Sequence, residues 1–532
     1  MDTDTIIIGN GPSAMILSYI LHGHIPYYSS QPPHPDPLLH AKLEGAPALL
    51  GADVNALTEH FAASRLSYST QALPVNVLLD TLVRPSVDVE ELQSVTNVEW
   101  RYEPEKAVPH WVLGNAPRPG GQWTENRMPA SWEIQTLSYA SMLCLPGYSF
   151  AEHYRETTGK DLPAYTRPSR QETADYFRAY PKAVGIDDAF CSNENVWGIT
   201  RQEDRFFLRS HNIHCKHLVL ASGIFSEVLQ PRSLLQPLTS LQPVPETPLL
   251  VIGSGFSAAD VIISAPVNQK IIHVFKWDPE NRPSPLRGCH QHAYPEYAGV
   301  YRLMRRAALT AQMNSTKRVR PLRTTSYPFL ESRSWADIYE GFPNTAISDV
   351  QTQEEVAVVT FRCPDGTTLT RNVRGMVYAT GRRGTLSYLD QSLLREVIDS
   401  DDEVDINPTV SGQTLREKAI DNTEVAKNIF IIGSLTGDSL IRFAYGSCVQ
   451  AAGKLIDVST GDDKTKSIST PASKQEVSIG VMRGIDGHDV FPNGGHICLG
   501  KEDHAVASSE PARAAPKGIW TWLMGIWRGC EA

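Results

Sequence analysis

Residues 5–14 read TIIIGNGPSA, a β-branched run followed directly by a glycine-rich turn. The run over residues 5–8 predicts a buried strand, and the apolar residues after Pro12 predict a helix. In a strand, turn and helix with the pattern G-x-G-x-x-[GA], the first glycine permits the tight turn and the second lets a pyrophosphate approach the backbone. The helix N-terminus then offers free N–H groups to that charge. Because Gly9, Gly11 and Ala14 fit this pattern, the start of the chain is predicted to bind a dinucleotide.

The same pattern returns near the middle of the chain. Residues 249–252 read LLVI and lead into GSGFSA at 253–258, so that Gly253, Gly255 and Ala258 repeat the spacing of the first turn. A single match is a weak signal, since glycine-rich turns are common connectors. Two matches, each between an apolar strand and an apolar helix, make chance agreement improbable. The chain is therefore predicted to carry two dinucleotide-type turns.

The segments around these turns also repeat. Residues 206–208 and 356–361 each begin a hairpin, and each hairpin feeds a strand that ends at a glycine, in ASG at 221–223 and ATG at 379–381. The Asp365-Gly366 pair supplies the positive φ that a tight hairpin turn requires. A last buried strand over 429–432 precedes Gly437-Asp438 and a helix over 446–456.

These elements predict an α/β fold with two Rossmann-like dinucleotide-binding domains, the second inserted in the first. The expected boundaries are 1–240 for the first part of the first domain, 241–375 for the second domain and 376–458 for the rest of the first domain. Residues 459–532 are rich in small and polar residues with little periodic apolar pattern, which predicts a flexible tail. The tail contains IWTWLMGIW at 519–527, which is too short to span a bilayer. We expect this Trp-rich end to dock on the domain or in a partner groove, with a membrane interface as the alternative.

Composition narrows the function classes. The 532 residues include 41% hydrophobic and 20% charged residues, values typical of a folded globular protein. A net charge of −10 argues against a nucleic-acid partner. Eight cysteines without a C-x-x-C pair predict neither a zinc site nor a dithiol centre, and favour reduced thiols in a cytoplasmic protein without a metal. The absence of a run of 18 apolar residues predicts that there is no transmembrane span.

A third glycine motif, PGGQW at 119–123, gains its meaning from this context. Paired glycines permit close packing against a flat ring, and Trp123 adds an aromatic wall. Taken alone, the motif is more often an ordinary turn beside a core tryptophan. Together with two dinucleotide turns, the strands ending in ASG and ATG, and Gly437-Asp438, it matches a flavoprotein pattern in which FAD lies on the first turn and NADPH on the second.

On these residues the chain resembles the flavin-dependent monooxygenase superfamily and, within it, the oxidative stress-induced growth inhibitor family. The resemblance runs from about residue 4 to 458 and is carried by GNGPS at 9–13, PGGQW at 119–123, YPEY at 294–297 and GDSLIRF at 437–443. It implies an FAD enzyme that consumes NADPH and forms a flavin C4a-(hydro)peroxide with O₂ to oxygenate a small organic substrate, in redox or growth regulation or in biosynthesis. Since the oxidising chemistry would belong to the cofactor, no catalytic side chain is assigned.

The resemblance also implies the roles of matching positions. Gly9, Gly11 and Ser13 would contact the FAD pyrophosphate. Gly120, Gly121 and Trp123 would lie near the flavin, and Asp438 at the ribityl chain or the pyrophosphate end, with a helix N-cap as its alternative role. The NADPH pyrophosphate would face Gly253, Gly255 and Ser257, and Lys276, after the strand over 271–275, would pair with the 2′-phosphate or remain a solvated lysine.

The sequence departs from the family pattern in three places. An acidic residue about 20 positions after the first glycine usually binds the adenosine ribose, whereas residues 27–31 read YYSSQ. Ser29 or Gln31 must then substitute, or FAD binds more weakly. The fingerprint of flavin-containing monooxygenases is missing between Gly223 and Val251, and Asp278 near Lys276 opposes a 2′-phosphate.

Two further clusters of side chains have simple interpretations, and the residues leave two other functions open. CHQH at 289–292 is expected to be a surface loop rather than a metal site. The basic residues between 302 and 323 are expected to be solvated, with an anionic partner as the sharper alternative. The alternative activities are an N-hydroxylase of amines and, in another class, a catalytically weak flavoprotein that acts as an interaction or regulatory protein.

Overall fold

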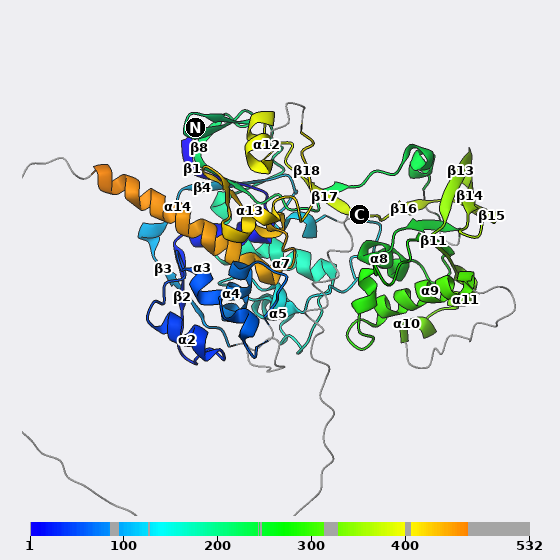
Figure 1. The fold of residues 1–532 in the computed structure, drawn as a ribbon, viewed down its shortest axis with the longest axis horizontal. Coiled ribbons are helices and arrows are strands. Elements are labelled where there is room, and N and C mark those ends of the chain that lie inside the picture. Colours follow the sequence, from blue (N-terminus) through cyan, green and yellow to red (C-terminus); the bar gives the residue numbers. More distant parts are fainter. Residues whose placement is uncertain are drawn as a thin grey trace, which may run out of the picture. The chain divides into compact units, whose positions relative to one another are not determined.

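The computed structural model of the chain describes residues 2–66, 68–85, 95–125, 128–242, 244, 247–312, 328–399 and 406–466 (Figure 1). The fold is mixed α/β, as predicted from the sequence. The proposed tail lies almost wholly outside the described residues, and its Trp-rich end lies entirely outside them. The same holds for part of the basic stretch: Lys317, Arg318, Arg320 and Arg323.

The first sheet is built around the strand that opens the chain. β1 (Asp2–Ile8) lies between β4 (His110–Gly114) and β8 (Ile213–Leu220), and it runs parallel to both. Ile6, Ile7 and Ile8 are all buried, as expected for a central strand with a parallel neighbour on each side and both faces covered. The remaining strands of the sheet are β5 (Phe190–Ser192), β6 (Ile199–Gln202), β7 (Arg205–Leu208), β19 (Glu424–Ala426) and β20 (Ile429–Ile431).

Helices from distant parts of the chain share the core of this first sheet. Side chains of α1 (Pro12–Leu21), α4 (Pro74–Val83), α7 (Arg170–Ala183) and α14 (Ala444–Lys466) pack in one cluster with β1, β4, β8 and β20. Around this core lie β2 (His24–Tyr28) and β3 (Val98–Tyr102), which pair with each other, and the helices α2 (Pro37–Glu44), α3 (Val54–Thr58), α5 (Ala140–Leu143), α6 (Phe150–Thr158), α12 (Gln391–Ile398) and α13 (Arg416–Asp421).

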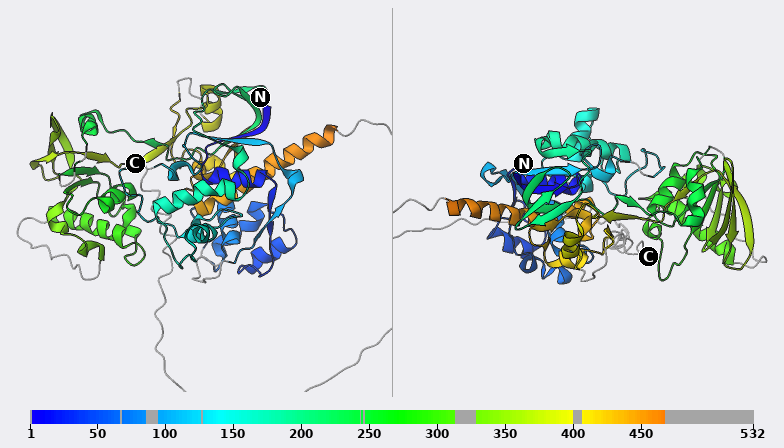
Figure 2. Two further views of the ribbon diagram at one scale, coloured as in Figure 1. Left: turned by 180° about the vertical axis from the view of Figure 1, so that it is seen from behind. Right: turned by 90° about the horizontal axis from the view of Figure 1, so that it is seen from above.

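The second sheet is smaller and fully parallel. Its strands follow the order β12 (Tyr339–Pro343), β11 (Ile271–Phe275), β10 (Leu249–Ile252) and β16 (Met376–Tyr378). On one face Val251 packs with α8 (Phe256–Ser264) and α9 (Pro295–Gln312). On the other face Leu250 packs with a three-stranded antiparallel sheet of β13 (Ala346–Gln353), β14 (Val356–Arg362) and β15 (Thr368–Val373), which Figure 2 shows from two further sides.

The remaining short strands and helices lie in connecting segments. β9 (Glu227–Val228), β17 (Arg382–Thr385) and β18 (Thr409–Val410) form a small sheet, and α10 (Pro328–Glu331) and α11 (Trp335–Ile338) precede β12. All four strands of the second sheet fall between β8 and β20 in the sequence, which is the order that an inserted domain predicts.

Several local predictions agree with these bounds. The strand expected over 271–275 is β11, and the Asp365-Gly366 turn joins β14 to β15 with Gly366 at φ +85°. The helix expected over 446–456 is part of α14, which continues past the predicted domain end at 458 to Lys466. Within the described residues, no helix is long and apolar enough to cross a membrane.

Candidate functional site

The first glycine turn joins β1 to α1. Gly9 has φ +116°, and a Cβ there would lie 2.5 Å from the carbonyl oxygen of Ala221 at the end of β8, so the position requires glycine. Gly11 is the N-cap of α1, and a Cβ on it would meet no described atom within 4 Å. Among the described residues, no side chain caps α1, and its first turn carries no acid. The N–H groups at the start of α1 therefore remain available to an anion.

Two other segments close on this turn. The amide of Gly120 donates to the carbonyl oxygen of Asn10 at 2.8 Å, and a Cβ on Gly121 would lie 3.0 Å from Cα of Gly11. Gly433, after β20, packs directly on the side chain of Ser13. The structure thus brings together the candidate residues Gly9, Gly11, Ser13, Gly120 and Gly121, and it adds Gly433. Sequence reasoning missed Gly433, although its place at the end of a buried strand was a usable signal.

Asn10 is a second residue that the motif did not reveal. Its side chain is buried, and Nδ2 donates to the carbonyl oxygens of Ala116 at 3.2 Å and Arg118 at 3.3 Å. These bonds hold the segment that leads into PGGQW against the first turn. Trp123 packs on Phe177 of α7, with ring centroids 5.9 Å apart, and so fixes the far end of the same segment.

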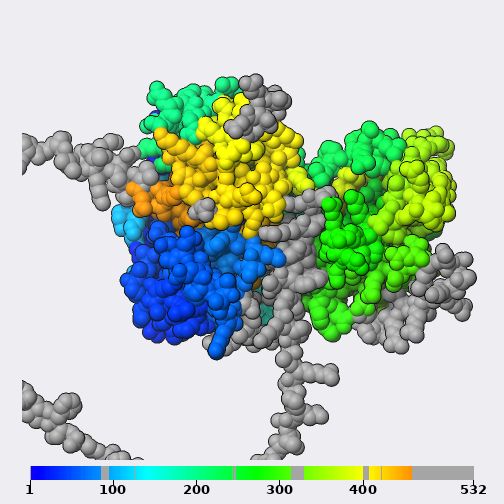
Figure 3. All heavy atoms as spheres, viewed as in Figure 1, coloured from blue at the N-terminus to red at the C-terminus, as the bar shows by residue number. Residues whose placement is uncertain are grey.

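Asp438 serves the start of another helix. Its buried carboxylate accepts hydrogen bonds from the amide of Leu73 at 2.7 Å, Nδ2 of Asn76 at 2.7 Å and Nη1 of Arg416 at 2.9 Å. Leu73 is the N-cap of α4, so Asp438 satisfies the start of α4. It does not cap the helical segment Ile441–Phe443 that follows it, whose N-cap is Leu440. On the face drawn in Figure 3, residues from the first part of the chain (blue) lie against yellow and orange residues from its later part. A contact of Asp438 with a ribityl chain or pyrophosphate stays a prediction.

The second turn has the same local form as the first. Gly253 has φ +147°, and a Cβ there would collide with the carbonyl oxygen of Ala379 after β16. Gly255 is the N-cap of α8, and within the described part of the chain no side chain caps this helix and no acid stands in its first turn. Ser257 is the second residue of α8 and is partly exposed. The second set of candidate pyrophosphate residues therefore also lies at an open helix start.

A buried histidine on β11 forms a hydrogen bond with the second turn. Nε2 of His273, on β11, lies 2.7 Å from the carbonyl oxygen of Gly253, and Nδ1 lies 2.8 Å from the hydroxyl of Tyr339. Burial lowers the pKa of His273 to about 4, so the ring is neutral at physiological pH. Because a carbonyl oxygen can only accept, Nε2 donates to Gly253 and Nδ1 accepts from Tyr339. No motif in the sequence pointed to His273.

Lys276 follows β11, the strand next to β10, and its side chain is exposed. Asp278 accepts hydrogen bonds from the amide and side chain of Asn281, which hold the pKa of Asp278 below its usual value. Asp278 therefore keeps its negative charge two residues from Lys276. Pairing of Lys276 with a 2′-phosphate stays a prediction, and the opposing charge noted in the sequence is present.

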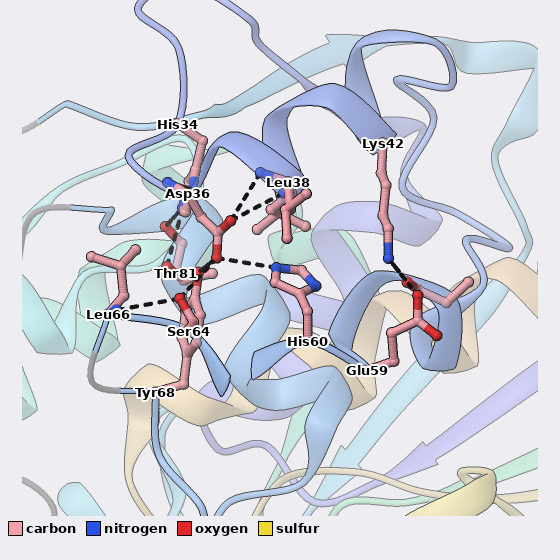
Figure 4. Close-up of polar contacts among 12 residues, drawn as sticks. His34, Asp36, Leu38, Lys42, Glu59, His60, Ser64, Leu66, Tyr68 and Thr81 are labelled. Carbon is pink, nitrogen blue, oxygen red and sulfur yellow. Dashed lines mark hydrogen bonds and ion pairs between the residues drawn. The ribbon is translucent and has the colours of Figure 1, made fainter. Parts of the chain in front are cut away.

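The acid that the family pattern expects after β2 is not replaced by Asp36, the first carboxylate beyond that strand. Figure 4 shows the Asp36 carboxylate surrounded by donors. It accepts from the amides of Leu38 at 3.1 Å and Leu39 at 3.3 Å, and from the side chains of His60 at 3.1 Å, Ser64 at 3.2 Å and Tyr68 at 2.8 Å. These five bonds occupy the carboxylate. Ser29, partly buried, and Gln31, exposed, remain the candidates for a ribose contact.

The CHQH segment gives no metal site. Cys289 is buried, and the amide of His292 lies 3.4 Å from Nδ1 of His290 within the same turn. Within the ranges that the structure describes, no group of three or more His, Cys, Asp or Glu residues is placed to hold a metal ion.

Comparison with known proteins supports the resemblance found in the motifs. No family model matches the chain. It is 27% identical to oxidative stress-induced growth inhibitor 1 of Mus musculus over 509 residues, covering 86% of this chain and 95% of the relative. It is 26% identical to oxidative stress-induced growth inhibitor 2 of Homo sapiens over 508 residues, covering 84% and 91%. The chain is a homologue of the oxidative stress-induced growth inhibitors.

Solved structures with a similar arrangement include a flavin-containing monooxygenase from Stenotrophomonas maltophilia, with a TM-score of 0.46, 13% identity, and coverage of 86% of this chain and 99% of that chain. Ornithine hydroxylase from Pseudomonas aeruginosa, in its reduced form, has a TM-score of 0.45, 14% identity, and coverage of 86% and 99%.

Proposed function

We propose that this homologue of the growth inhibitors is an FAD-dependent monooxygenase that consumes NADPH and oxygenates a small organic substrate with O₂. One observation carries the proposal: α1 and α8 start at glycine turns without a side-chain cap or an acid in the first turn. By contrast, side chains cap α2, α3, α6, α7 and α12, and the described short helices α5, α11 and α13, which also lack a side-chain cap, do not start at a glycine turn. At the start of α6, Ser149 and Glu152 form a capping box, and Ser169 and Glu172 do the same for α7. Two open helix starts, each at a glycine turn after a buried strand, suit two pyrophosphate groups.

The surroundings of the two turns support the order of the cofactors. FAD is assigned to the first turn, where the 120–123 segment and Gly433 also meet Gly11 and Ser13, because a resident flavin needs contacts along its length. NADPH is assigned to the second turn, with Gly253, Gly255 and Ser257 at its pyrophosphate and Lys276 at its 2′-phosphate. In this assignment the first sheet, with its parallel strands β5, β4, β1, β8 and β20, and the fully parallel second sheet belong to two Rossmann-like domains, the second inserted in the first.

The residues of the chain have binding and orienting tasks in this proposal. Bound FAD, once reduced by NADPH, supplies the chemistry with O₂. The open N–H groups of α1 and α8 bind the pyrophosphates, Asn10 fixes the segment that would pack against the flavin, and His273 holds the carbonyl of Gly253 so that the second turn keeps its form. The described cysteines are free, in keeping with the cytoplasmic location that we propose.

A second candidate is a flavoprotein with weak turnover that acts through a partner. The observation that favours it is the missing acid after β2, because the Asp36 carboxylate is engaged by five protein donors. Weak FAD binding would follow if Ser29 and Gln31 do not compensate.

The test begins with the purified chain supplied with FAD. We expect flavin absorbance bands at about 370 and 450 nm that remain with the protein on desalting. NADPH should then bleach the band near 450 nm, and turnover under ¹⁸O₂ should place labelled oxygen in a product of a substrate screen. Absence of bound flavin would remove both candidates, and bound flavin that NADPH does not reduce would favour the second.

A further inference from the structure

The Tyr294-Pro295-Glu296-Tyr297 motif, which the proposed binding sites do not use, lies at the start of α9. The hydroxyl of Tyr294 donates to the carbonyl oxygen of Leu137 at 2.9 Å. Glu296 accepts from Nη2 of Arg167 at 2.6 Å, and the hydroxyl of Tyr297 donates to Oδ1 of Asp260 on α8 at 2.8 Å. The motif therefore binds three separate parts of the chain.

Arg167 is the centre of these contacts, which together form a joint between α7, α8 and α9. It is 8% exposed, and its guanidinium also donates through Nε to the carbonyl oxygen of Thr136 at 2.7 Å and through Nη1 to that of Ala293 at 2.8 Å. Its guanidinium carbon lies 4.7 Å from the ring centre of Tyr294. Because the guanidinium is planar and its N–H donors are fixed in three directions, the three acceptors can move little relative to one another without loss of these hydrogen bonds. Because Arg167 stands just before α7, the starts of α7 and α9 are held together.

α7 continues the connection to the first turn. Its first residue, Arg170, donates through Nη2 to the carbonyl oxygens of Gln122 at 3.3 Å and Glu125 at 2.5 Å. Further along α7, Phe177 packs against Trp123, and a Cβ on Gly120 would lie 3.2 Å from Cβ of Phe177. α7 thus holds the 120–125 segment in place through Arg170 and Phe177.

Asp260 connects the joint to the second turn, since α8 begins at that turn. Burial raises the pKa of Asp260 to about 6, although the bond from Tyr297 and the charges of Arg170 and Arg382 act in the lowering direction and Glu296 in the raising direction. The carboxyl therefore changes its charge near neutral pH at a point where α7, α8, α9 and the start of β17 meet.

We propose that Arg167, Glu296 and Tyr297 are positioning residues that hold the second glycine turn in a fixed relation to the 120–125 segment. This inference rests on the proposed function, in which a hydride passes from NADPH to FAD between these two places. Hydride transfer demands close and oriented rings, and a misplacement of about 1 Å costs on the order of 100-fold in rate. The joint would thus act on the rate of transfer and not on the binding of either cofactor.

The test compares Arg167→Lys, Glu296→Gln and Tyr297→Phe with Tyr301→Phe as the matched control. Tyr301 lies one turn further along α9, where its ring packs on Trp277. Stopped-flow reduction of bound FAD by NADPH should slow by about 10 to 100-fold in Arg167→Lys, with the Kd values of FAD and NADPH changed less than about twofold. Tyr301→Phe should match the unmodified chain. Lost affinity with an unchanged limiting rate would overturn the proposal.

The pH profile gives a readout that a merely structural role would not move. Ionised Asp260 attracts Arg170, so the reduction rate should rise with pH through a midpoint near about 6. Tyr297→Phe removes a hydrogen bond that favours the ionised form, and should move this midpoint upward. An identical midpoint in Tyr297→Phe and the unmodified chain would contradict the assigned role of Tyr297.

Hydrogen exchange of the protein without FAD separates this inference from the proposed function. Amides of the 120–125 segment should exchange faster in Arg167→Lys than in Tyr301→Phe, since the start of α7 loses its anchor. If the chain binds no flavin, the proposed function fails, yet the exchange result still decides whether the joint exists. Equal exchange in all variants would overturn the joint itself.

Discussion

The two glycine turns share a local form and differ in what surrounds them. At both, a glycine with positive φ meets a carbonyl oxygen of a neighbouring strand end, and a second glycine starts an uncapped helix. The first turn is further enclosed by the 120–121 glycines and Gly433, which come from distant parts of the chain. The second turn is instead held by a hydrogen bond from His273 to the carbonyl oxygen of Gly253. The comparison teaches that one local pattern can stand in two different settings, and under the proposed function the enclosed one would hold FAD and the other NADPH.

The largest effect is expected from Gly9→Ala in the enclosed turn. The new Cβ would lie 2.5 Å from the carbonyl oxygen of Ala221 at φ +116°, and strain plus overpacking cost roughly 3–5 kcal/mol. We expect loss of bound flavin and a lower midpoint of thermal unfolding. Gly45→Ala is the control, because a Cβ there meets nothing within 4 Å at φ −80°. Flavin content equal to that of the control would show that the first turn is not the flavin site.

Gly253→Ala should separate the two turns. Its Cβ would collide with the carbonyl oxygen of Ala379, so the second turn must deform. We expect the variant to keep its bound flavin while reduction by NADPH slows by at least about 100-fold, since each deformed contact at a cofactor raises the barrier. Flavin absorbance and stopped-flow reduction measure the two effects in one sample. A variant that loses flavin but keeps its affinity for NADPH would reverse the assignment of the turns.

Gly11→Asp tests whether the open helix start serves an anion. A side chain at this position has room, and an Asp N-cap stabilises a helix relative to a Gly N-cap by only a few tenths of a kcal/mol. The protein without FAD should therefore unfold at a slightly higher temperature, whereas the added carboxylate should repel a pyrophosphate and weaken FAD binding by about 10-fold or more. Calorimetry of the chain with and without FAD measures both the rise in unfolding temperature and the loss of FAD affinity. Stabilisation with unchanged FAD affinity would remove the pyrophosphate from this turn.

The sequence predicted the parts of the fold that are local. The strand before Gly9, the helix after Gly11, β11 and the Asp365-Gly366 turn all follow from periodicity and turn chemistry within a few residues. The mixed α/β class follows from the same pattern.

The parts that the sequence did not predict depend on partners far along the chain. Gly433 gains its role only against Ser13, and His273 only against Gly253 and Tyr339. Asp438 caps α4 through Leu73, a contact that no spacing rule contains. The saturation of Asp36 is likewise set by His60, Ser64 and Tyr68, which donate to its carboxylate from beyond α2. Local motifs locate such a site, and only the tertiary contacts show which side chains are free to serve it.

The smallest expected effect concerns pH and sharpens the comparison of the two halves. Beside each glycine turn or the helix that follows it lies one histidine whose pKa is lowered by desolvation to about 4: His110, which contacts Ser18 of α1, and His273, which contacts Gly253. Such a group contributes stability that is present above its unfolded pKa of about 6.5 and is lost as pH falls toward 4. We therefore expect the midpoint temperature of thermal unfolding to decrease as the pH is lowered from 6.5 to 4. His273→Gln, which keeps a donor, should flatten part of this slope, and so should His110→Gln. If His273→Gln leaves the slope unchanged, the imidazole of His273 is not the neutral donor to Gly253 that its burial requires.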